Sequence, residues 1–399
     1  MTMATAAPTA RPRLGAVMRE RGRVTPLELF FDLVFVLGFT QCTALIVEHP
    51  NWDGIGQGML VLAVLWWAWV GYAWLTSVVD PEEGAVRIAI FAAMAGLLVV
   101  ALSVPEAFGD RALAFAIAYG VVRAGQIALF VLASRDDPAL RRSVWGLAIG
   151  SAIGVGLLAG ASFLDGAPQA SLWVLAILLD WGEPALFGSE GWKLVPAHFA
   201  ERHGLVIILA LGESIVALGV GATVGLTAGV IAAAVLGIAL ASALWWIYFD
   251  VVALVTERRL TGAAEGRERN TLARDSYSYL HFPMVAWIVL VAFGLEQTLA
   301  HVDDPLHTEP AFALLGGISI YLLAHVALRL RNALSLNRHR LLLALVLFAL
   351  LPVAVELSAL ATLVGVATLL WAMIAYETAG YGEERYRTRH PVAAEPPSA

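Results

Sequence analysis

The stretch Thr25-Pro-Leu-Glu-Leu-Phe-Phe-Asp-Leu-Val-Phe-Val-Leu-Gly-Phe-Thr-Gln41 predicts a membrane-spanning helix. It is mostly apolar and carries two acids, Glu28 and Asp32, which lie four residues apart and therefore on one helical face. A charged side chain in hydrocarbon costs roughly 2.5 to 3.5 kcal/mol on insertion scales, so such residues usually face a bundle interior and mark a site. We therefore expect a helix bundle in a membrane.

The composition of the whole chain supports this fold class. Of its residues 59% are hydrophobic and 14% are charged, and the mean hydropathy is +0.77, whereas soluble domains carry about 25% charged residues. The net charge is −7, and the sequence shows no basic face of the kind that nucleic acid binding needs. Cys42 is the single cysteine, which excludes an intrachain disulfide and a Cys-based zinc site.

The apolar runs predict an all-α integral membrane protein of about twelve spans. A helix needs about 20 mostly apolar residues to cross a bilayer. On that length we place spans near residues 26–47, 57–79, 85–107, 111–133, 142–163, 168–187, 198–220, 225–255, 274–300, 309–331, 340–358 and 360–380. Ten spans would also leave both ends of the chain on one side of the membrane.

The distribution of basic residues predicts the orientation. With the amino terminus in the cytoplasm, only Arg111 and Arg123 of the 25 Lys and Arg residues lie outside the predicted cytoplasmic loops and tails. This is the positive-inside pattern of an even number of spans. We therefore expect both termini in the cytoplasm.

The two halves of the chain show matching motifs in the same order. The matched pairs are Leu33–Leu37 with Leu205–Leu209, Leu65-Trp66-Trp67 with Leu244-Trp245-Trp246, Glu106 with Glu296, Tyr119 with Tyr321, and Arg123 with His325. They predict a tail at 1–24, a first transmembrane repeat at 25–188, a second at 189–382 and a tail at 383–399. Six spans per copy would give two parallel repeats related by an axis along the membrane normal, as in many transporters. The alternative is that apolar helices resemble one another by chance.

Six polar residues inside predicted spans are candidates for a substrate or proton site. They are Asp32, Gln41, Arg123, Glu213, Asp250 and His325. Glu28 is expected to cap its helix. Gln41 and Glu213 occupy matching places, each about 20 Å from its helix start, and predict a polar pair where the repeats meet. Gly38 and Gly212 on these helices would allow close helix approach.

Arg123 is the deepest predicted cation, and an unpaired arginine there would be very costly. Glu213, Asp32 or Glu106 are possible partners. Its counterpart His325 has a side chain of the type that titrates near neutral pH. Asp250 follows the second Trp pair within the apolar run and is either functional or merely paired.

Metal and nucleotide chemistry is not indicated. His198, Glu201 and His203 do not have the (i, i+4) histidine spacing of a helical zinc protease, and interface snorkelling and helix capping are the expected roles. The sequence contains no phosphate-binding loop, dinucleotide fingerprint or nucleophile elbow. We therefore expect no cofactor and no metal.

The run from Thr25 to Val36, together with His198-Phe-Ala-Glu-Arg-His-Gly-Leu205 and Leu211-Gly-Glu-Ser214, resembles the two signature stretches of the bacterial low temperature requirement A family. The resemblance covers roughly residues 19–381. It implies a multi-span protein of the bacterial cytoplasmic membrane, and it places the signature on Glu28, Asp32, Glu201, His203, Gly212 and Glu213. It implies no mechanism.

Two functions compete on these grounds. The first is a secondary transporter or channel-like permease for an unknown small molecule or ion, with buried carboxylates coupling movement to the proton gradient. The second is an intramembrane enzyme acting on a lipid or hydrophobic metabolite, with Asp32 and Glu213 as acid and base. The sequence offers the enzyme no nucleophile, so transport is the preferred hypothesis. A membrane scaffold or sensor is a third possibility, but the chain has no sizeable soluble domain.

Overall fold

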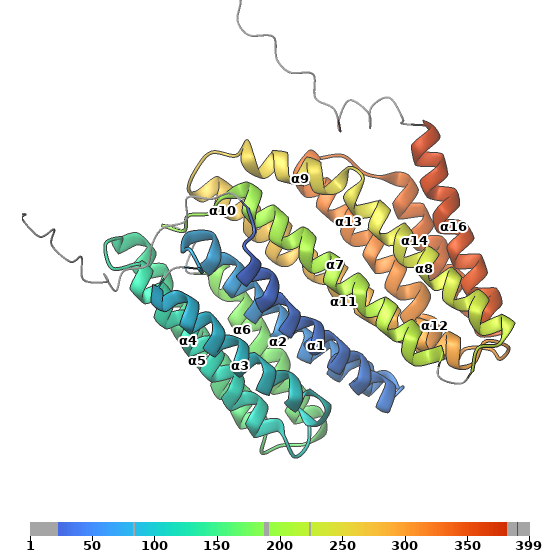
Figure 1. Ribbon diagram of the computed structural model, residues 1–399, viewed down its shortest axis with the longest axis horizontal. Coiled ribbons are helices and arrows are strands. Elements are labelled where there is room, and N and C mark those ends of the chain that lie inside the picture. Colours follow the sequence, from blue (N-terminus) through green and yellow to red (C-terminus); the bar gives the residue numbers. More distant parts are fainter. Residues whose placement is uncertain (1–22, 83, 187–190, 223–224, 381–388, 390–399) are drawn as a thin grey trace, which may run out of the picture.

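The computed structural model describes residues 23–82, 84–186, 191–222, 225–380 and 389. All regular structure in these ranges is helical, apart from an isolated β-bridge between Pro305 and Ser358. Figure 1 shows long helices running in roughly one direction, with α1 to α6 in one group and α7 to α16 in the other. The predicted tails, 1–24 and 383–399, lie outside the described residues except at positions 23, 24 and 389.

The first half consists of six long helices. They are α1 (Pro26–Glu48), α2 (Trp52–Val78), α3 (Gly84–Ser103) followed by the short η1 (Val104–Glu106), α4 (Ala112–Ala133), α5 (Pro138–Ala161) and α6 (Gly166–Leu186). Their starts follow local signals. Thr25 and Glu28 form a capping box with Pro26 at the first helical position, and Asp137 caps α5 just before Pro138.

The second half is divided into a larger number of shorter helices. It contains α7 (Pro196–Gly221), α8 (Ala228–Phe249), α9 (Val252–Thr261), α10 (Arg267–Ala273), η3 (Arg274–Tyr279), α11 (His281–Ala300), α12 (Thr308–Ala311), η4 (Phe312–Gly316), α13 (Gly317–Ala333), α14 (Arg338–Ala349), α15 (Leu351–Ala354) and α16 (Ala359–Gly380). Both η3 and η4 are π-helical turns that join two helices into one longer rod.

The count of spans is lower than predicted. In the described part of the chain, ten helices are long and apolar enough to cross a membrane. The two remaining predicted segments are helical but fall outside these ten: α6 contains Asp180 and Glu183, and α14 has only 12 residues. The structure is therefore an all-helical membrane protein, and neither twelve spans nor two six-helix repeats is confirmed.

The halves meet along α1 and α2 on one side and α7 and α11 on the other. The most buried helices are α2, the α10–α11 rod and the α12–α13 rod, so the interior is built on them. Large aromatic residues fill it, including Trp66, Trp69 and Tyr321. Large apolar side chains also cover the outside, among them Ile88, Val121, Leu178, Ile215, Val235 and Leu345. A surface of this kind fits lipid better than water.

Candidate functional site

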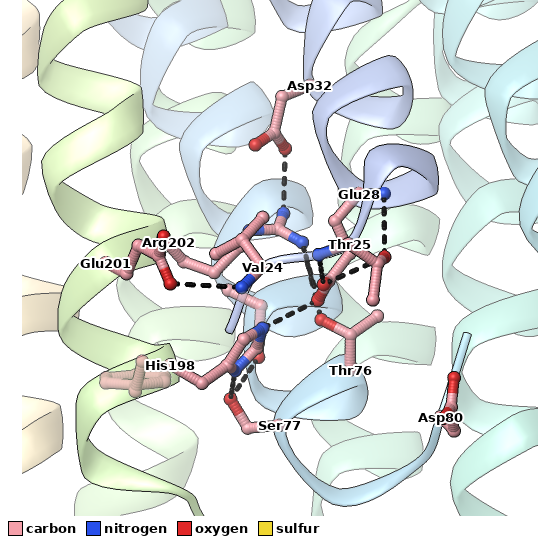
Figure 2. Close-up of polar contacts among 12 residues, drawn as sticks. Val24, Thr25, Glu28, Asp32, Thr76, Ser77, Asp80, His198, Glu201 and Arg202 are labelled. Carbon is pink, nitrogen blue, oxygen red and sulfur yellow. Dashed lines mark hydrogen bonds and ion pairs between the residues drawn. The ribbon is translucent and has the colours of Figure 1, made fainter. Parts of the chain in front are cut away.

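The junction of the halves holds a buried cluster of opposite charges. Glu28 and Asp32 project from α1 toward His198 and Arg202 on α7 (Figure 2). Arg202 Nη2 lies 2.7 Å from Asp32 Oδ1, Arg202 Nη1 lies 3.1 Å from Glu28 Oε1, and His198 Nε2 lies 2.8 Å from Glu28 Oε1. All four side chains are at most 1% exposed. Charges from both halves are thus removed from solvent together.

Residues of α2 complete this junction cluster. Trp69 Nε1 donates to Asp32 Oδ1 at 2.9 Å, and Arg202 Nη1 donates to Thr76 Oγ1 at 3.4 Å. The hydroxyl of Ser77 donates to the carbonyl of Ala73, so its oxygen accepts from His198 Nδ1 at 3.1 Å. Because His198 Nε2 also faces a carboxylate, both ring nitrogens act as donors, which suits the imidazolium form. The cluster then balances two anions with two cations.

The predicted capping role of Glu28 is confirmed, since its Oε2 accepts from the Thr25 backbone N–H at 2.8 Å. The roles predicted for His198 were wrong. Its ring is fully buried in the junction cluster and does not snorkel to an interface. Arg202 was missed as a site residue. Spacing could have found it, because His198 and Arg202 are four residues apart on α7, as Glu28 and Asp32 are on α1.

The other signature residues surround this cluster. Glu201 is exposed and accepts a hydrogen bond from the Val24 backbone N–H at 3.0 Å. His203 is buried next to Trp69, with ring centroids 4.9 Å apart, and its Nδ1 donates to the Phe199 carbonyl. Its Nε2 has no hydrogen-bond partner in the described chain. The carbonyl contact fixes which ring nitrogen carries the proton in the neutral form.

Deeper along the same junction, Glu213 of α7 accepts a hydrogen bond of 2.6 Å from Thr40 of α1. The predicted contact between α1 and α7 at this depth exists, but the partner is Thr40 and not Gln41. Gly212 does not provide close packing, because a Cβ there would meet nothing within 4 Å, whereas one at Gly38 would lie 3.1 Å from Leu65. No ion pair joins Glu213 to a basic side chain among the described residues.

Arg123 belongs to a separate cluster inside the first half. Its Nη2 lies 2.9 Å from Asp180 Oδ1 on α6, and its Nη1 donates to Gln126 at 2.7 Å. Its Nη2 also donates to Ser151 of α5, and Tyr119 donates to Asp180 Oδ2 at 3.1 Å. None of the three predicted acids is the partner. Depth could have identified Asp180, because it lies 14 residues into α6 and Arg123 lies 11 residues into α4.

Two cavities are lined by residues whose positions match in the motif alignment of the two halves. The larger, about 480 Å³, is lined by residues of α8, α9, α13, α14 and α16, including Trp246, Asp250, His325, Leu328 and Asn332. The smaller, about 60 Å³, is lined by residues that include Trp67, Gly71, Arg123, Gln126 and Phe130. The motif alignment of α2 with α8 and of α4 with α13 pairs these two sets one by one.

The six predicted site residues therefore do not form one cluster. Asp250 and His325 line the larger cavity, and Arg123 lines the smaller one. Asp32 and Glu213 lie at the junction, with Gln41 next to Thr40 on α1. Asp250 forms an ion pair of 3.0 Å with Arg389. A part in transport stays a prediction for each of them.

A third hollow, about 690 Å³, lies between α7 and α8–α9 and is lined by Glu201, Ile208, Tyr248, Glu257 and Tyr277, among others. Ile208 is exposed, so this groove is on the side of the bundle. In the described part of the chain, no three His, Cys, Asp or Glu side chains are arranged to hold a metal ion.

Long apolar helices around buried ionic clusters define a polytopic α-helical membrane protein. The profile of the family described as bacterial low temperature requirement A protein (LtrA) matches residues 23–375. The chain therefore belongs to the bacterial low temperature requirement A family, as the two signature stretches predicted. It is 30% identical over 313 residues, 74% of each chain, to a protein of Rhizobium meliloti (strain 1021) described as uncharacterized protein RA0937. No solved structure matches the chain.

Proposed function

We propose that this protein is a secondary transporter or permease of the bacterial cytoplasmic membrane whose two halves move against each other. The junction cluster is the observation that carries the proposal. Burying ion pairs stabilises a fold little, because desolvation offsets the attraction, and they are best attested as devices that select one arrangement. A four-charge cluster that joins the halves at one end of α1 and α7 suits a contact that opens and closes.

Helix packing supports a duplicated architecture of twelve helices for this transporter. In the first half α1 packs on α2 and α3, α3 on α4, α4 on α5, α5 on α6, and α2 on α6. In the second half α7 packs on α8 and α11, α11 on α13, α13 on α14, α14 on α16, and α8 on α16. The two sequences of contacts correspond step by step. Rigid-body rocking of such repeats is a common basis of alternating access.

The larger cavity is the proposed entry site for the solute. It lies where α13 ends and α14 begins, among arginines whose distribution favours a cytoplasmic position for this face. Figure 1 shows the ends of α9, α13 and α14 at the same end of the bundle. Its volume is within the usual range of small-molecule sites, roughly 300 to 1,000 Å³.

Glu213 is the proposed proton-coupling group. It is buried in the junction, and Glu296 is the next acid near it. When a carboxyl group at the contact of α1 and α7 gains or loses a proton, the charge changes at the surface along which the two halves would separate. Proton binding and the opening of the junction would then be linked.

The test is proton movement in proteoliposomes that contain a trapped pH-sensitive dye. An imposed pH gradient should collapse faster in vesicles with the intact protein than in empty vesicles. The Glu213→Gln variant should behave as empty vesicles do, and the Glu48→Gln variant, altered at the exposed end of α1, should match the intact protein. Unchanged movement with Glu213→Gln removes Glu213 from the mechanism, and no protein-dependent movement rejects proton coupling.

The groove on the side of the bundle, between α7 and α8–α9, supports an intramembrane enzyme as a second candidate function. It reaches the side of the bundle, and the hydroxyl of Tyr277 has no partner in the described chain. An enzyme of this kind would process lipid extracts in detergent without any gradient. Product formation by the purified protein from such extracts would favour it over transport.

A further inference from the structure

His325 lines the larger cavity and has one buried ring nitrogen without a hydrogen-bond partner in the described chain. Its side chain is 2% exposed and lines the cavity. Its Nδ1 lies 2.8 Å from the Tyr321 carbonyl, which only accepts, so Nδ1 carries the proton of the neutral ring. The opposite ring atom, Nε2, has no partner in the described chain. Among the ring atoms of this cavity-lining residue, Nε2 is thus the one left as a hydrogen-bond acceptor.

The same cavity is also lined by residues that carry hydrogen-bond donors. The indole Nε1 of Trp246, on the same wall, is buried and has no partner in the described residues. Among the described residues, Arg329 at the rim makes one side-chain hydrogen bond, from Nε to Ser335 at 2.9 Å, and Arg338 forms no ion pair. Guanidinium groups with unused N–H donors favour carboxylate or phosphate oxygens.

The acids of the cavity are already neutralised. Glu377 forms a two-point contact with Arg340, through Nε at 3.1 Å and Nη2 at 3.0 Å. Asp250 pairs with Arg389. A cationic solute would therefore find both carboxylates occupied, whereas an anion would find Arg329 and Arg338, which form no ion pair with the described residues.

The cavity at the matching positions of the first half is much smaller. There the guanidinium of Arg123 and the amide of Gln126 stand where the second half has His325 and Leu328, and only about 60 Å³ remains. Of these two cavities, the one in the second half is thus large enough for a ligand.

We propose that the larger cavity binds a small organic anion that also carries a hydroxyl or amino group. The anionic group would lie against Arg329 and Arg338, and the hydroxyl or amino group would donate to His325 Nε2. The inference rests on the proposed function in taking this ligand as the transported solute. Binding itself is measurable without transport.

Malate and succinate form a matched pair of probes, because they differ by one hydroxyl group. Thermal unfolding of the purified protein in detergent is followed at increasing concentrations of each, at constant ionic strength, with choline chloride as the cationic probe. Malate should raise the midpoint at lower concentration than succinate, and choline should not raise it.

Two variants and one control locate the site. Arg338→Gln should weaken the apparent affinity for both anions about tenfold, since a charge-assisted hydrogen bond is lost. His325→Phe, which removes the acceptor and keeps an aromatic ring, should abolish the difference between malate and succinate. Arg142→Gln, an exposed arginine on α5 outside the cavity, should change nothing.

Equal effects of malate and succinate, equal effects of choline, or equal losses with Arg338→Gln and Arg142→Gln would each overturn the proposal. The two functional claims fail separately. Anion binding without Glu213-dependent proton movement rejects coupled transport but keeps the site. Glu213-dependent movement without selective anion binding keeps the transporter and rejects this ligand.

Discussion

At the scale of single residues, two ion pairs of nearly equal length should differ in their contribution to stability. Arg123–Asp180 spans 2.9 Å with both side chains almost fully buried, and Arg111–Glu106 spans 3.0 Å with both about half exposed. Arg123→Met should lower the free energy of unfolding by about 3 to 5 kcal/mol, because Asp180 is left charged and buried. Arg111→Met should change it by less than about 1 kcal/mol. Denaturant unfolding in detergent measures both.

The double variant Arg123→Met, Asp180→Leu separates the pair from its surroundings. It should recover most of the lost stability, since an apolar pair of similar volume is often neutral in place of a buried ion pair. If it is as unstable as Arg123→Met alone, the contacts to Ser151 and Gln126, rather than an orphaned carboxylate, account for the loss.

The residue types of these clusters were predicted and their partners were not, although helix depth and residue spacing pointed to Asp180 and Arg202. An arginine inside a span requires an acid, and the sequence offers several. Asp180 becomes the partner only when α5 packs on both α4 and α6, because this brings the polar residues of the three helices together at similar depth. Asp32 likewise meets Arg202 across the junction, 170 positions along the chain.

At the scale of helices, two glycines near the end of α7 provide a packing test. A Cβ at Gly221 would lie 2.8 Å from the Glu296 carbonyl oxygen and 2.9 Å from Leu299 Cβ on α11, whereas one at Gly219 would meet nothing within 4 Å. Gly221→Ala should destabilise the protein by about 1 to 3 kcal/mol through overpacking. Gly219→Ala should be neutral or slightly stabilising. Equal thermal midpoints for the two variants would contradict the close approach of α7 and α11.

Helix positions were largely predictable, because proline and capping residues mark where apolar runs begin, as at Thr25-Pro26 and Asp137-Pro138. The π-helical turn η3 was not. Its carbonyls at Ser276 and Ser278 accept from the side chains of His281 and Trp66 at 2.8 Å each. Because a contact as distant in sequence as Trp66 helps to hold this backbone, a local sequence pattern does not predict the π-helical turn.

At the scale of the whole molecule, the path of α6 through the membrane determines the orientation of α7 to α13. If α6 crosses, the α9–α10 loop is cytoplasmic and the α11–α12 loop is external. If α6 does not cross, the α9–α10 loop is external and the α11–α12 loop is cytoplasmic. The composition of α6 gives only weak support for a membrane crossing, because a charged side chain in the membrane is costly. The pairing of buried Asp180 with Arg123 removes the main part of that cost. We therefore expect α6 to cross.

Single cysteines test this expectation directly. Cys42 is buried and is the single cysteine, so Cys42→Ala provides a background without reactive thiols. Ala264→Cys and Asp303→Cys place exposed thiols in the two loops. In right-side-out vesicles a membrane-impermeant maleimide should label position 303, and it should label position 264 only after permeabilisation. The reverse result would mean that α6 stays on one side, which would put the arginines of α9, α10 and the larger cavity outside the cell. The positive-inside distribution makes that arrangement the unfavourable one.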